Sequence, residues 1–114
     1  MGDRRTAKIQ MSNGSLYIYS HGGGKSMVQD AEQAIIAAKS RWHDESYATR
    51  IIVDQMTKYV RDRTEGYGLM LCPAEGGDEY GANPSIIIDL RRRRLVVCSK
   101  NEKESYEKTF SSLL

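Results

Sequence analysis

The chain has 114 residues, of which 39% are hydrophobic and 28% are charged, and its formal net charge is +2. This length and mixture are typical of one globular domain, residues 1–114, with a core of its own. The net charge is too small to imply nucleic-acid binding by itself, and no apolar run is long enough for a membrane-spanning helix.

Two stretches near the start alternate in polarity. Residues 6–11 place Ala7, Ile9 and Met11 on one face, and residues 15–19 form a similar run. The dipeptide Asn13-Gly14 lies between them. Because both residues tolerate a positive φ, the pattern predicts a hairpin with a type I′ turn.

Two helices are expected next. Ser26 with Gln29 three residues later fits a capping box, and an apolar stripe follows at helical spacing: Val28, Ala31, Ile35, Ala38 and Trp42. Asp44 is a natural N-cap for a second helix through about residue 63. The predicted inward face of that helix is Ala48, Ile51, Ile52, Gln55, Met56 and Tyr59.

Strands dominate the remainder. Residues 66–72 are predicted to form a third strand ended by Pro73, and residues 74–84 a loop. Residues 85–90 and 94–99 are predicted to form a second hairpin, turned over four consecutive arginines. Three isoleucines in succession, residues 86–88, indicate burial on both faces and hence a central strand. The C-terminal segment is expected to dock through Tyr106, Phe110 and Leu113.

The predicted order is therefore ββααβββ. It corresponds to an α+β domain of two layers, in which two helices cover one face of a mainly antiparallel sheet of about five strands. The two cysteines, Cys72 and Cys98, form no Cys-x-x-Cys pair. We expect them to be partly buried thiols in a reducing cytoplasm rather than a disulfide.

The strand-to-helix junction after Tyr19 is the first candidate binding site. His21, Gly22, Gly23, Gly24, Lys25 and Ser26 follow one another there. Free backbone N–H groups at a positive helix end, with a lysine beside them, suit an anionic group. The alternative is that these glycines only let the chain turn tightly.

More specific interpretations of this junction fail on missing residues. A P-loop needs a glycine where the chain has Tyr19, and the oxyanion loop of an esterase needs a Gly-x-Ser-x-Gly nucleophile, which the sequence lacks. His21 and His43 are the only histidines, and neither has a suitably spaced metal partner. No catalytic residues, cofactor or metal site are predicted.

The second candidate is the arginine run Arg91, Arg92, Arg93 and Arg94. It could contact phosphate or a partner, or it could be a charged turn that prevents edge-to-edge association. Sequence-specific reading of DNA is not expected, because no recognition helix is predicted. Tyr80, in the loop of residues 74–84, could stack on a base.

Several motifs resemble a family of small phage- and prophage-encoded proteins without an assigned activity. They are the strand ending at residues 19–23, the Arg-Trp-His-Asp break at 41–44, the Thr-Glu-Gly-Tyr-Gly segment at 64–68 and the hairpin at 86–95. The three glycines at 22–24 depart from the large aromatic residue often found there in the family. The resemblance implies a soluble accessory protein in the cytoplasm of a bacterial host, of a kind that often opposes host defence.

Two functional hypotheses follow. The first is a homo-oligomeric, non-enzymatic protein that sequesters an anionic small molecule, in particular a nucleotide immune signal. Lys25 and the amides of residues 22–24 would hold phosphate, residues 91–94 of the same or a neighbouring subunit would assist, and Tyr19 or Tyr80 would stack on the base. The second is a protein-interaction module that inhibits or redirects a host protein. A large exposed apolar patch would favour the second hypothesis.

Overall fold

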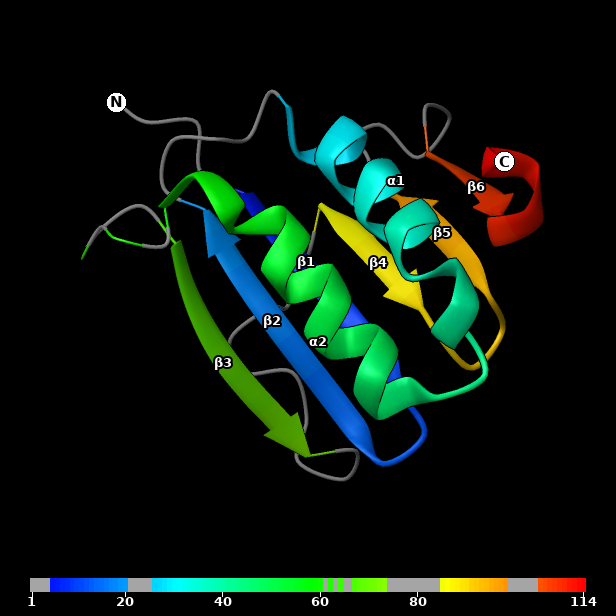
Figure 1. Ribbon diagram of the computed structural model, residues 1–114, viewed down its shortest axis with the longest axis horizontal. Coiled ribbons are helices and arrows are strands. Elements are labelled where there is room, and N and C mark those ends of the chain that lie inside the picture. Colours follow the sequence, from blue (N-terminus) through cyan, green and yellow to red (C-terminus); the bar gives the residue numbers. More distant parts are fainter. Residues whose placement is uncertain are drawn as a thin grey trace.

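The structure is a computed structural model, and it describes residues 5–20, 26–60, 62, 64, 67–73, 85–98 and 105–114. One sheet forms the back layer and two helices form the front layer (Figure 1). The strands are β1 Arg5–Met11, β2 Gly14–Ser20, β3 Tyr67–Pro73, β4 Ile86–Asp89, β5 Arg94–Val97 and β6 Tyr106–Thr109. The helices are α1 Met27–Ala37 and α2 Glu45–Met56, with short 3-10 turns η2 Lys39–Arg41, η3 Lys58–Val60 and η5 Phe110–Leu113.

The six strands lie in the order β3-β2-β1-β4-β5-β6. The pair β1–β4 is parallel and the other four pairs are antiparallel. The predicted α+β class is therefore confirmed, while the count of about five strands was too low. The missed strand is β6, whose residues are all exposed, so its sequence carries no alternation of buried and exposed positions.

The core lies between the sheet and the helices. It takes its buried residues from the helix-facing side of the sheet and from both helices: Ala7, Ile9, Ile18, Ile86, Ile88, Leu95, Ala31, Ala34, Ile35, Ala48 and Ile52. Ile86 and Ile88 are 0% exposed, while Ile87 on the opposite face is half-buried. β4 lies between β1 and β5, so it is the interior strand that its run of isoleucines predicted, although only the isoleucines of its helix-facing side are fully buried.

The first hairpin forms, although its turn differs from the predicted type I′. Its two loop residues are Ser12 and Asn13, and neither has a positive φ. Gly14, the first residue of β2, has instead a φ of 157°, which side chains of L-residues rarely adopt. Gly14 is therefore the first strand residue after a loop of Ser12 and Asn13, and not the second loop residue that a type I′ turn at Asn13-Gly14 would make it.

The first helix begins after Ser26 without the predicted capping box. The Ser26 hydroxyl donates to Asp30 Oδ2 at 3.0 Å, and the Ser26 side chain caps no backbone N–H of the helix. After α1 the chain tightens into η2. Trp42 then donates its indole N–H to the carbonyl of Ile35 at 2.8 Å, which fixes the connection between the helices.

The second helix has the predicted N-cap, since Asp44 accepts a hydrogen bond from the N–H of Tyr47. It ends at Met56, earlier than predicted. The next residue, Thr57, donates both its backbone N–H, at 3.0 Å, and its hydroxyl, at 2.7 Å, to the carbonyl of Val53. Tyr59 consequently lies outside α2 and is exposed, whereas it was predicted to face the core.

The C-terminal segment docks through one aromatic residue. Phe110 is 1% exposed, and its ring centroid lies 5.1 Å from that of Trp42. Leu113 is half-buried, as expected for a docked residue, whereas Tyr106 is exposed. This contact holds β6 and η5 beside α1.

Candidate protein-binding edge

Strand β3 forms one edge of the sheet and exposes apolar side chains. Leu69 is 54% exposed and Leu71 is 74% exposed, and both lie on the face that the helices cover elsewhere. Neither α1 nor α2 lies over β3, which curves away from α2 at the left of the view (Figure 1). Leucines at these positions therefore contribute little to the core.

β3 also has backbone N–H and C=O groups that point away from the sheet, and the strand pairing shows which ones they are. The carbonyls of Thr6 and Gln10 accept hydrogen bonds from the β4 side, at 2.8 Å from Ser85 and 3.0 Å from Leu90. Because backbone direction alternates along a strand, Ala7, Ile9 and Met11 must point their N–H and C=O groups toward β2.

The same alternation carries across β2. The backbone N–H and C=O groups of Ile18 and Leu16 point toward β1. Those of Tyr17 and Tyr19 therefore point toward β3, where these residues pair with Met70 and Gly68. The N–H and C=O groups of the intervening β3 residues, which are Tyr67, Leu69 and Leu71, therefore point away from the sheet. Within the described part of the chain, these groups have no hydrogen-bond partner.

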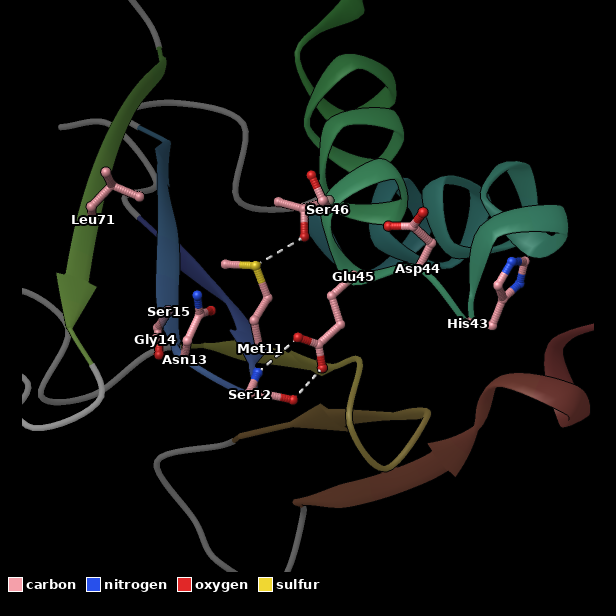
Figure 2. Close-up of a pocket in the computed structure, with 11 residues that line it drawn as sticks. Met11, Ser12, Asn13, Gly14, Ser15, His43, Asp44, Glu45, Ser46 and Leu71 are labelled. Carbon is pink, nitrogen blue, oxygen red and sulfur yellow. Dashed lines mark hydrogen bonds between the residues drawn. The ribbon is translucent and has the colours of Figure 1, made fainter.

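An open groove of about 1080 Å³ lies beside Leu71, between the β1–β2 turn and the start of α2 (Figure 2). Glu45 accepts two hydrogen bonds from Ser12 across it, one from the backbone N–H and one from the hydroxyl. Thr49 donates its hydroxyl to Met11 Sδ at 3.3 Å. The two carboxylates that line the groove, Glu45 and Asp44, are thus both engaged by the protein itself, since Asp44 accepts a hydrogen bond from the N–H of Tyr47.

The predicted anion site is described only in part. Tyr19 is half-buried in β2 and lines a small cavity of about 140 Å³ with Tyr17 and residues 68–70 of β3. Ser26 lies at the start of α1. The other predicted residues of this site lie outside the described residues: His21, Gly22, Gly23, Gly24, Lys25 and Tyr80.

The arginine run forms the β4–β5 turn. The carboxylate of Asp89 accepts hydrogen bonds from the backbone N–H groups of Arg91 and Arg92 and also faces the Arg91 side chain at 3.7 Å. Arg94 pairs with Glu107 on β6 at 3.1 Å. Arg92 and Arg93 are exposed, and neither has an acidic partner among the described residues.

Tyr19 and the arginine turn lie at opposite ends of the sheet. Tyr19 pairs with Thr6, whereas Asp89 pairs with Gln10, four residues further along β1. That separation is about 13 Å along the strands, and the two strand spacings from β2 to β4 add about 10 Å across them. The described part of one chain therefore does not bring Tyr19 and the arginines together, and a site that uses both needs a second chain.

The described residues offer little catalytic chemistry. They contain no group of His, Cys, Asp and Glu side chains that could hold a metal ion. Burial raises the pKa of the Cys98 thiol above its ordinary value, so this thiol is not an activated nucleophile. In the same ranges, no helix has both the length and the apolar character needed to span a membrane.

Comparison with known protein families, curated proteins and solved structures finds no match. The interpretation of the site therefore depends on the geometry of this chain. The open edge was not predicted from the sequence, although one signal was available: residues 67–73 include no charged side chain.

Proposed function

We propose that this protein is a non-enzymatic interaction module that binds another polypeptide as an added strand along β3. The observation that carries the proposal is the coincidence of two properties at Tyr67, Leu69 and Leu71. Their backbone groups point away from the sheet, and the two leucine side chains are exposed on one face.

This arrangement suits binding by strand addition. An extended segment that lies beside β3 would receive backbone hydrogen bonds from the outward N–H and C=O groups, which supply affinity. Every second side chain of that segment would face Leu69 and Leu71, and this would select apolar residues. The groove beside Leu71 leaves room for one of these side chains.

The opposite edge strand, β6, carries charged side chains, and this difference supports β3 as the binding edge. β6 carries Glu107 and Lys108 side by side, and Lys108 forms an ion pair with Glu32 of α1 at 3.2 Å. Charged residues on an edge strand discourage association with other strands. β3 carries no charged side chain and has a proline only at its last residue, Pro73, so β3 rather than β6 is the edge suited to a partner.

The proposal develops the second of the two sequence-based hypotheses, that of a protein-interaction module, and it defines the bound polypeptide by an extended backbone and apolar side chains rather than as a host protein. Capture of a nucleotide stays a prediction, since most of its residues lie outside the described ranges. An open apolar edge is a feature that protein binding uses and that nucleotide capture does not require.

Site-specific photocrosslinking in bacterial cells tests the proposal. The photoreactive amino acid p-benzoylphenylalanine replaces Leu71 in one variant and, as the matched control, the exposed Tyr106 of β6 in another. We expect a discrete protein adduct from position 71 and none from position 106. If position 71 yields no adduct, or if both positions yield the same set, β3 is not a binding edge.

A further inference from the structure

We infer that the strand added to β3 is the β3 strand of a second copy of this protein, related to the first by a two-fold axis at Leu69. The inference rests on the proposed function and names its partner. The result would be one continuous sheet formed by two chains.

The backbone of β3 is complementary to itself. Its outward residues are Tyr67, Leu69 and Leu71, which are symmetric about Leu69. In an antiparallel pair centred there, Leu69 faces Leu69 of the second copy, and Tyr67 faces Leu71 of the second copy. All three positions are hydrogen-bonded pairs, which gives roughly six backbone hydrogen bonds between the chains.

The side chains on the helix-facing side match in this register. The leucines at position 69 would cover each other, and each exposed Leu71 would be covered by a tyrosine ring. Cross-strand pairs of aromatic and aliphatic side chains stabilise antiparallel strands. This pairing would remove from water the two most exposed leucines of the sheet.

The opposite face of the strand matches as well. Gly68 faces Met70 of the second copy in the same register. A Cβ atom added at Gly68 would meet no atom within 4 Å, so the space over this residue is open. Met70 is 38% exposed, and its flexible side chain could fill that space in the second copy.

Charge does not oppose this pairing. Residues 67–73 are Tyr-Gly-Leu-Met-Leu-Cys-Pro, so no like charges meet when the strand faces its own copy. The two-fold axis runs perpendicular to the sheet, which places the helices of both copies on the same face. No helix of the described residues lies over β3 to block this approach (Figure 1).

Analytical ultracentrifugation with a charge-swap pair tests the inference. The wild-type chain is expected to sediment as a dimer. Leu69→Lys and Leu69→Glu, studied separately, each place like charges opposite each other and should weaken dimerisation about tenfold or more. An equimolar mixture should restore the dimer, because position 69 faces itself only in the two-fold register. Lys108→Glu on β6 is the matched charge control and should leave the dimer unchanged.

Thermal unfolding of each variant shows that the fold is retained, as expected for substitutions at a half-exposed position. A monomeric wild type, a dimer that Leu69→Lys leaves intact, or a mixture that stays monomeric would each overturn the inference. If the wild type is monomeric while position 71 still crosslinks to a different protein in cells, the self-pairing fails and the binding edge stands. If neither is seen, both fail.

Discussion

Glu45, the first residue of α2, holds Ser12 in the β1–β2 turn with both of its carboxylate oxygens. The backbone N–H of Ser12 donates to Oε1 at 2.9 Å, and the Ser12 hydroxyl donates to Oε2 at 2.7 Å. A helix start is thereby attached to a strand turn 33 residues earlier in the chain. This contact fixes one wall of the groove beside Leu71 (Figure 2).

Replacing Glu45 by alanine should release this attachment. Hydrogen bonds to a charged acceptor contribute more than neutral ones, and solvent exposure reduces the effect, so we expect a loss of about 1 kcal/mol in the free energy of unfolding. Urea denaturation followed by circular dichroism measures it. Ser46→Ala, at the next exposed position, is the control and should change the free energy by less than about 0.5 kcal/mol. Equal stabilities of the two variants would show that the Ser12 contact contributes nothing.

Phe110→Ala should be the most destabilising substitution in the C-terminal segment. Phe110 is buried against Trp42, and removal of a buried phenylalanine side chain costs about 3–5 kcal/mol. Chemical denaturation monitored by the fluorescence of Trp42, the only tryptophan, reports both the stability and the change beside its ring. Leu114→Ala removes an exposed side chain four residues later and should have little effect. A Phe110→Ala variant as stable as the wild type would mean that β6 and η5 do not depend on this contact.

Arg93→Gly should stabilise the protein. Arg93 has a φ of 55°, a left-handed conformation that is unfavourable for residues with a Cβ atom, and its carbonyl accepts a backbone hydrogen bond from Phe110. Glycine relieves the strain and retains the backbone bond, and after its entropic cost we expect a gain of about 0.5–1 kcal/mol. Arg92→Gly, at a neighbouring position without a positive φ, should instead destabilise. Thermal unfolding of both variants makes the comparison, and a melting temperature lower for Arg93→Gly than for Arg92→Gly would contradict the prediction.

A thermal-shift panel of cyclic and linear nucleotides separates the two hypotheses drawn from the sequence. If a nucleotide stabilises the protein through the glycine junction, Lys25→Ala should abolish the shift. The double variant Arg92→Ala, Arg93→Ala should reduce the shift only if a second chain brings the arginine turn to the site, because the turn and Tyr19 lie at opposite ends of the sheet. Absence of any shift, or a full shift in Lys25→Ala, would end the nucleotide hypothesis at this site.

Cys98 should react slowly with iodoacetamide in the folded protein. Burial raises the pKa of its thiol, so at a given pH less of the reactive thiolate is present than in the unfolded chain. The same shift contributes stability that is complete below the ordinary pKa of 9.0 and is lost as the pH rises through the folded value. Mass spectrometry of Cys98 alkylation at increasing pH measures the effect. A folded rate at pH 8 equal to that in denaturant would contradict it.

Local patterns in the sequence were enough to predict most of the elements. Asp44 was recognised as an N-cap because side-chain capping depends on residues within one helical turn. The isoleucines of β4 predicted an interior strand because such strands typically have apolar residues at successive positions. The sequence of β6 has no such apolar pattern, because this strand is held by backbone pairing with β5 and by the distant contact of Phe110 with Trp42.

What the sequence alone determined was the α+β class, the first hairpin, the two helices and the hydrophobic faces, because these follow from the short-range periodicity of apolar residues. Only the tertiary structure decided which strand lies at the edge. Leu69 and Leu71 look like core residues in the sequence, and they are exposed because the strand order places β3 outside β2, where neither α1 nor α2 covers it. Strand order depends on contacts between residues far apart in the chain, so the open edge at Tyr67, Leu69 and Leu71 appeared only once the sheet was assembled.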